Sequence, residues 1–141
     1  MIIDHLLMFT KDEGQKLTAA AASDYRLDFG QKAPTTGMDT DRPVAVFTIL
    51  SAVTGKLQIS LQHCDTETGS YEDCASSVEL DAPAEGTQIA IPLPNRHKRF
   101  MQAYFGGPSS GGPTAGTVHG FITSGFQDNV PFEQAPSIVT A

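Results

Sequence analysis

Residues 56–63 alternate between apolar and polar side chains, and this alternation constrains the fold more than any other feature of the sequence. The apolar positions are Leu57, Ile59 and Leu61, and glutamine or serine residues stand between them. A period of two places the apolar side chains on one face of a strand and the polar ones on the other. The segment is therefore predicted to be a β-strand with one face against a core.

Other segments predict further short strands. Residues 44–50 are apolar and β-branched on both faces, as in a central strand that is covered on both sides. Residues 51–55 end in glycine and are expected to join this strand to the next one as a hairpin loop. Pro92 and Pro94 lack a backbone N–H, so the end of the strand over 87–93 is expected to lie at a sheet edge or to leave the sheet. The remaining strands are expected at 17–22, 25–29, 74–80, 99–105 and 117–123.

The strand spacing and the composition together predict the fold class. The 141 residues fit one domain, and charged residues make up 18%, below the usual share of about 25%. Gly, Pro, Ser and Thr are abundant, which suits short strands joined by tight turns. We expect an all-β, jelly-roll-like antiparallel β-sandwich of about eight strands with extended N- and C-terminal arms. The expected divisions are an N-terminal arm (1–12), the sandwich (13–123) and a C-terminal tail (124–141).

The two ends carry apolar residues without a regular strand pattern. Such ends are candidates for packing against a partner, or they fold back over an open end of their own sandwich. Both interpretations stay open for the N-terminus, whereas the tail is interpreted as a surface-lying or disordered arm. The residues expected to contact a partner are Ile2, Ile3, Leu6, Leu7, Phe9, Val130 and Phe132. Deleting residues 1–9 is then expected to abolish that contact while leaving the β core folded.

Charge and hydropathy exclude several classes of partner. The net charge is −7, and the one basic cluster, 96–99, is too small for binding nucleic acid. It is interpreted as a solvated turn or a salt-bridging edge. No run of about 18 apolar residues is present, so no membrane span is expected. The N-terminus lacks the pattern of a signal peptide, so synthesis in the cytoplasm is expected.

Residue patterns that carry catalysis are missing from the sequence. There is no nucleophile elbow and no phosphate-binding glycine loop, so no enzyme activity and no cofactor are expected. The four histidines are scattered singly, which argues against a metal site. An acidic segment is interpreted as either a weak Ca²⁺ site or, more simply, a solvated loop; it contains Asp65, Glu67, Glu72 and Asp73.

Cys64 and Cys74 are the only cysteines. Cytoplasmic synthesis favours free thiols, but the spacing is also compatible with a bridge between two neighbouring strands. Both states stay open.

Several weak motifs follow one another in a fixed order along the chain. The motifs are Met1-Ile2-Ile3-Asp4, Leu7-Met8-Phe9-Thr10, Leu17-Thr18-Ala19, Leu27-Asp28-Phe29-Gly30, Leu57-Gln58-Ile59-Ser60-Leu61-Gln62, Gly69-Ser70-Tyr71, Pro92-Leu93-Pro94, Lys98-Arg99-Phe100 and Thr114-Ala115-Gly116-Thr117-Val118. In this order they resemble the capsid cement (decoration) proteins of tailed bacteriophages, among them that of the Bordetella phage head. The resemblance covers most of residues 1–123 and does not clearly extend to the tail.

The resemblance implies a structural protein on the outer surface of the phage head. Such a protein would clamp neighbouring major capsid subunits of an HK97-like shell and associate with itself as a dimer or trimer. The alternative is a β-sandwich module that binds a carbohydrate or a receptor. Trp is absent, which weakens the alternative, and the aromatic residues left for stacking a sugar are Tyr25, Tyr71 and Tyr104.

Overall fold

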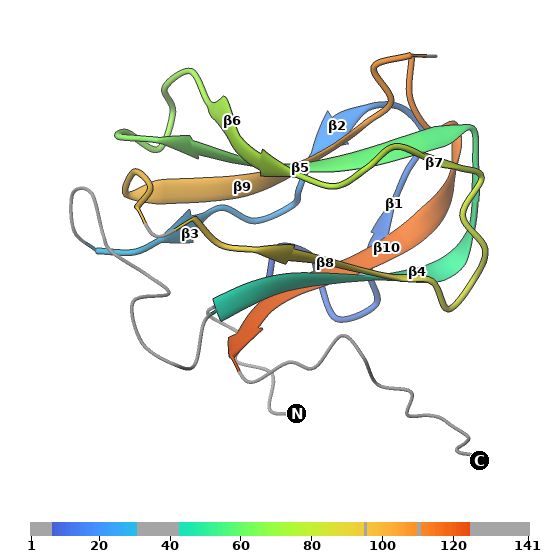
Figure 1. The fold of residues 1–141 in the computed structure, drawn as a ribbon, viewed down its shortest axis with the longest axis horizontal. Coiled ribbons are helices and arrows are strands. Elements are labelled where there is room, and N and C mark those ends of the chain that lie inside the picture. Colours follow the sequence, from blue (N-terminus) through green and yellow to red (C-terminus); the bar gives the residue numbers. More distant parts are fainter. Residues whose placement is uncertain (1–6, 31–42, 95, 110, 125–141) are drawn as a thin grey trace.

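Antiparallel strands form two sheets that pack face to face in a computed structural model (Figure 1). The structure describes residues 7–30, 43–94, 96–109 and 111–124. Ten strands lie within these ranges, and the predicted β-sandwich is confirmed. The count exceeds the expected eight for two reasons: two strands stand where one was predicted over 74–80, and the two-residue strand Gln15–Lys16 was not predicted. Within the described ranges, no helix is long and apolar enough to cross a membrane.

The two sheets are built from segments far apart in the sequence. The first sheet has four strands in the order β1 (Gln15–Lys16), β10 (Ala115–Ser124), β4 (Pro43–Thr54) and β8 (Gln88–Pro92). The second has the order β2 (Ala21–Ala22), β9 (Phe100–Gly106), β5 (Lys56–Cys64) and β6 (Glu72–Ser76), with β3 (Leu27–Asp28) paired to β9 and β7 (Leu80–Asp81) paired to β5. The predicted edge position of the strand that ends at Pro92 is confirmed.

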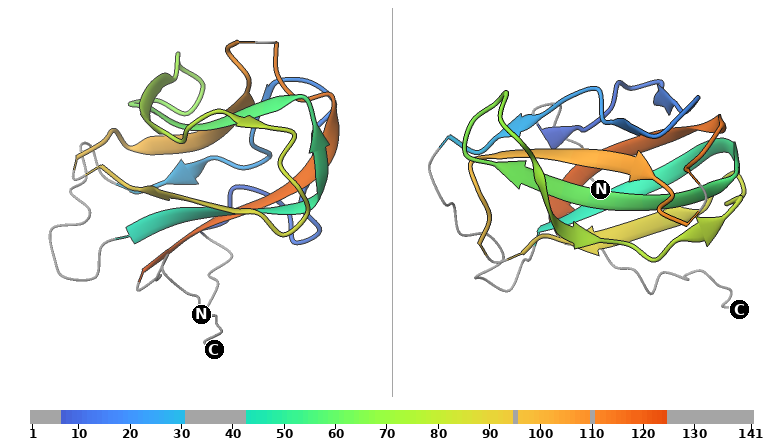
Figure 2. Two further views of the ribbon diagram at one scale, coloured as in Figure 1. Left: turned by 45° about the vertical axis from the view of Figure 1, so that its right-hand side comes forward. Right: turned by 90° about the horizontal axis from the view of Figure 1, so that it is seen from above.

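The expected hairpin between the strands over 44–50 and 56–63 is wrong. β4 continues to Thr54 and β5 begins at Lys56, yet the two strands belong to different sheets. Gly55 alone turns the chain, with a φ of +93° that disfavours residues with a side chain. Figure 2 shows β4 curving up into β5 at one side of the sandwich. The chain thus changes sheets at a one-residue corner.

The residues before β4 form shorter strands than predicted. The segment expected over 17–22 pairs only at Ala21–Ala22, and that over 25–29 only at Leu27–Asp28. The chain passes from the first sheet to the second between β1 and β2, and single hydrogen bonds hold it on either side of this passage. The Leu17 N–H donates to the Gly116 carbonyl, and the Ser23 N–H donates to the Ala103 carbonyl. A segment that crosses between layers cannot keep long ladders with either.

The core lies between the sheets around three phenylalanines. The ring centroids of Phe9 and Phe47 are 5.6 Å apart, and those of Phe47 and Phe105 are 6.0 Å apart. All three side chains are fully buried. The predicted inward face of β5 is confirmed for Leu57, Ile59 and Leu61, and Val118 and Ile122 of β10 lie in the same core.

β4 is covered on both faces near its start, as predicted. Ala45 and Phe47 face the core, whereas Val46 belongs to a second, small apolar cluster with Met8 and Phe121. Alternation along the strand puts this cluster on the outer face of the first sheet. The covering does not extend along the whole predicted segment, because Leu50 is 39% exposed.

Candidate binding surfaces

The two ends of the described chain lie side by side on the first sheet. Met8 forms an isolated antiparallel bridge with Phe121 of β10, and the Phe9 N–H donates to the Gly120 carbonyl at 2.9 Å. The Gly120 N–H in turn donates to the Thr10 hydroxyl at 3.1 Å. β10 ends at Ser124, so the first and the last described residues lie near the same edge of this sheet.

The prediction that Phe9 contacts a partner is wrong. Its side chain is 0% exposed and stacks on Phe47, so it cannot reach a partner without leaving the core. Leu7 is partly buried and packs against the same core. For these residues the interpretation that the N-terminus covers its own sandwich describes the structure. The sandwich therefore begins by residue 7 and not at residue 13.

The other predicted contact residues lie outside the described ranges. These are Ile2, Ile3, Leu6, Val130 and Phe132. Their two segments, 1–6 and 125–141, join the sandwich at Leu7 and at Ser124. They are therefore attached at one place.

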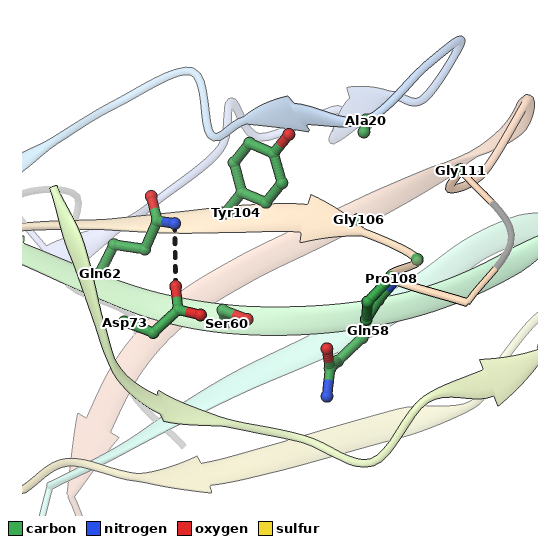
Figure 3. Close-up of a pocket in the computed structure, with 10 residues that line it drawn as sticks. Ala20, Gln58, Ser60, Gln62, Asp73, Tyr104, Gly106, Pro108 and Gly111 are labelled. Carbon is green, nitrogen blue, oxygen red and sulfur yellow. Dashed lines mark hydrogen bonds between the residues drawn. The ribbon is translucent and has the colours of Figure 1, made fainter.

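A polar groove of about 370 Å³ lies on the outer face of the second sheet (Figure 3). Its floor comes from β5 and β9, where Ser60 is paired with Tyr104 and Gln62 with Gln102. Asp73 of β6 stands on one side, and the loop after β9 (Gly107, Pro108, Gly111) stands at the end. From the alternation of residues 56–63, Ser60 and Gln62 are predicted only to lie on the face opposite the core.

Hydrogen bonds connect four side chains across this face. Arg26 Nε donates to Gln102 Oε1 at 3.1 Å, and Gln102 Nε2 donates to Gln62 Oε1 at 2.8 Å. Gln62 Nε2 then donates to Asp73 Oδ1 at 2.9 Å. A cation at one end and a carboxylate at the other fix the orientation of both amides, and each bond polarises the next. The chain of bonds holds Asp73 in place beside the groove.

The acidic loop after β5 is held by the remaining bonds of Arg26. The Arg26 guanidinium lies 5.3 Å from the Tyr71 ring centroid and donates to the Glu67 carbonyl at 3.0 Å. The Tyr71 hydroxyl donates to the same carbonyl at 2.8 Å. In the described part of the chain, no three His, Cys, Asp or Glu side chains are placed to hold a metal ion together.

Both cysteines are free thiols. The Cys64 sulfur lies under the acidic loop, 3.8 Å from Thr66 Oγ1, on the face that β5 turns away from the core. Cys74 packs against the core instead. A register shift in the β5–β6 pairing separates the pair Leu61–Ala75 from the pair Gln62–Asp73, so Cys74 has no residue opposite it. Burial raises the pKa of Cys74 to about 11, so this thiol stays protonated.

The basic cluster is a salt-bridging edge, one of the two predicted interpretations. Arg99 binds Asp28 through two hydrogen bonds of 2.7 and 3.0 Å, and the Arg99 guanidinium lowers the pKa of that carboxyl. Lys98 Nζ lies 3.4 Å from Glu72 Oε1. These pairs are exposed, so each adds little stability.

His97 is the buried member of the same cluster. Its side chain is 3% exposed and packs edge-on against Phe29, with ring centroids 4.4 Å apart. Nδ1 lies 2.8 Å from the Lys98 carbonyl, which can only accept, so the neutral ring carries its proton on Nδ1. Nε2 is buried and has no hydrogen-bond partner among the described residues. Burial lowers the pKa of His97, against a smaller raising effect of the Lys98 carbonyl.

We expect the protein to lose stability as the pH falls below about 6.5, the ordinary histidine pKa. In this range the unfolded chain binds a proton at His97 that the folded chain resists, so unfolding is favoured as the pH falls. Burial lowers the pKa of His63 and His119 as well, so both act in the same direction. Urea unfolding midpoints at about pH 7.5 and about pH 5 measure the loss.

The variant His97→Phe isolates the contribution of this one ring. It keeps an aromatic contact with Phe29 and removes the titrating nitrogen. The urea unfolding midpoint of this variant should change less between the two pH values than the midpoint of the natural protein. Equal changes in both proteins would contradict the assignment to His97.

The two packed antiparallel sheets place the chain in the class of β-sandwich domains. The model of the Bbp16 family matches residues 11–122, most of the chain, and the protein belongs to this family. The family carries the name of a Bordetella phage protein, which points to a phage protein. The phage origin expected from the sequence resemblance agrees with this match. A comparison with curated proteins gives no match.

Proposed function

We propose that this protein is a structural component of the phage virion that binds the outside of the head. In this role it clamps neighbouring major capsid subunits of an HK97-like shell and stabilises the capsid. It is made in the host cytoplasm, associates with itself as a dimer or trimer, and has an adhesive rather than a catalytic task.

The junction of the two chain ends on the first sheet is the observation that carries this proposal. The segments 1–6 and 125–141 are attached beside the Met8–Phe121 bridge, and they contain the five predicted contact residues that lie outside the described ranges. Two apolar segments at one place can bind the same partner surface. Burying one such side chain contributes about 1.5–3 kcal/mol before the cost of ordering.

The rest of the sandwich suits a part that is repeated on a lattice. Membership of a phage protein family supports a role in the virion. The two sheets enclose one buried core, and a preformed scaffold lowers the ordering cost of binding. Weak individual contacts are enough to stabilise a shell, because many copies bind to the same shell.

Binding to empty heads tests the proposal. The purified full chain is mixed with expanded heads from a phage that lacks this gene, and bound copies are counted after sedimentation and by electron cryomicroscopy. Saturable binding on the outer surface is expected, with heads that resist heating better than bare heads. A protein that stays in the supernatant and is absent from mature virions would overturn the proposal.

Two variants locate the contact. A triple change of Ile2, Ile3 and Leu6 to serine keeps the chain length and should lower the occupancy strongly. Val78→Ser is the matched control, because Val78 is 74% exposed on the sandwich itself. Full occupancy of the triple variant would reject the N-terminal contact. The expected deletion of residues 1–9 is unsuitable, because it also removes Phe9 from the core.

A further inference from the structure

We infer that the groove on the second sheet is a saccharide-binding site in which the Tyr104 ring is the stacking platform. This site goes beyond the proposed head binding and does not depend on it. A particle that carries many copies would gain a weak, multivalent affinity for glycans through this face.

A glycine gives the Tyr104 ring its place in the groove. Tyr104 and Gly106 are two residues apart on β9, so both face outward. A Cβ atom at Gly106 would lie 2.9 Å from Tyr104 Cε2, so a larger residue there would displace the ring. Figure 3 shows the ring standing over β9 between Gln62 and Ala20. Apolar C–H faces of a pyranose ring pack on such an aromatic surface.

Polar groups suited to sugar hydroxyls surround this ring. The hydroxyls of Ser60 and Tyr104 have no hydrogen-bond partner among the described residues, and each can donate and accept. Asp73 uses Oδ1 to accept from Gln62, and Figure 3 shows its other oxygen turned away from Gln62, on the side of Ser60. The bonds from Arg26 through Gln102 and Gln62 fix this carboxylate before a ligand arrives, which lowers the ordering cost of binding.

Charge selects a neutral ligand over an anionic one. Asp73 is the one charged residue that lines the groove, and no Lys, Arg or His among the described residues does so. A phosphate or sulfate group would meet a carboxylate without a cation. The volume of about 370 Å³ lies in the usual range for small-ligand sites, about 300–1,000 Å³. A neutral mono- or disaccharide satisfies both conditions.

The other two tyrosines are less suited to stacking. Arg26 covers the Tyr71 ring, and the Tyr71 hydroxyl is already bonded to Glu67. Tyr25 is 45% exposed but lies outside the groove, near Met8 and Thr10. Tyr71→Ala would therefore disturb the acidic loop. Tyr104 is the residue to change.

Nuclear magnetic resonance of the ¹⁵N-labelled full chain tests the inference. The probes are glucose, galactose, mannose, N-acetylglucosamine, lactose and maltose, each added at increasing millimolar concentration. At least one sugar should shift the backbone signals around Ser60, Asp73 and Tyr104 in a saturable way. Inorganic phosphate should leave these signals unchanged.

Three variants and one control decide the outcome. Tyr104→Ala should raise the dissociation constant of the sugar about two- to tenfold, because the stacking surface is lost. Asp73→Asn keeps an acceptor for Gln62 but replaces the other oxygen with an amide donor, and it should also weaken binding. Gly106→Ala should weaken binding by displacing the ring. Tyr25→Ala should bind as the natural protein does.

Three results would overturn the inference: no sugar shifts the groove signals, shifts gather elsewhere, or Asp73→Asn and Tyr104→Ala bind unchanged. If Tyr104→Ala gives the spectrum of an unfolded chain, Asp73→Asn decides alone. Head binding is measured separately with the Tyr104 and Asp73 variants, and it should stay unchanged. A loss of sugar binding and a loss of head binding are thus distinguishable.

Discussion

Phe9→Ala is expected to lower the free energy of unfolding by about 3–5 kcal/mol, the usual cost of removing a fully buried phenylalanine. The ring of Phe9 stacks on Phe47, which in turn contacts Phe105, so the change leaves a cavity between the sheets. The backbone of Phe9 stays bonded to Gly120, which limits the collapse of that cavity. Urea unfolding followed by circular dichroism measures the loss.

Val78→Ala is the control for Phe9→Ala. Val78 is 74% exposed, so its truncation should change the free energy of unfolding by no more than about 0.5 kcal/mol. An equally small effect of Phe9→Ala would mean that residues 7–9 are not part of the folded sandwich. The N-terminal arm would then extend to residue 12, as the sequence suggested.

Gly120→Ala should destabilise the protein by about 1–3 kcal/mol through overpacking. A Cβ atom at Gly120 would lie 2.4 Å from Phe47 Cδ1 and 2.5 Å from Phe47 Cε1. The ring is fully buried and held between Phe9 and Phe105, so it cannot move aside freely. Without this contact the change should stabilise the strand by about 0.5–1 kcal/mol, because glycine weakens a strand. The sign of the effect therefore tests the contact.

A second change in the partner ring provides the control for Gly120→Ala. In a Phe47→Leu background the bulk opposite Gly120 is smaller, and Gly120→Ala should cost less than it does alone. The difference between the two costs is the coupling energy of the pair. Additive costs, measured by thermal and urea unfolding, would show that Gly120 is required for another reason.

Strand positions and inward faces could be predicted from the sequence because they depend on local alternation. Leu57, Ile59 and Leu61 lie in the core as their spacing predicts, and Pro92 lies on an edge strand. Alternation does not say which sheet a strand joins. The sequence around Gly55 therefore predicts an ordinary hairpin. Only the pairing of β4 with β10 and β8 shows that the chain changes sheets there.

The groove and the position of Phe9 depend on contacts between distant residues. Ser60 and Tyr104 are partners only because β5 pairs with β9 in one register. Each alone is an unremarkable residue on a polar face. Phe9 sits among the apolar residues of the N-terminus, and its place in the core follows from the bonds of residues 9 and 10 to Gly120. The glycine pair 106–107 follows an aromatic strand, and this local pattern alone predicts only a loop.

The placement of the two sulfur atoms has a consequence for the proposed role on a phage head. Cys64 and Cys74 lie on opposite sides of one sheet, so no covalent link between them can form without rearranging the strands. The folded chain is then a single chemical species in the reducing interior of a cell and in aerated water outside it. Subunits assembled before lysis would need no oxidative maturation, and their hold on a shell would not change with the redox potential of the surroundings.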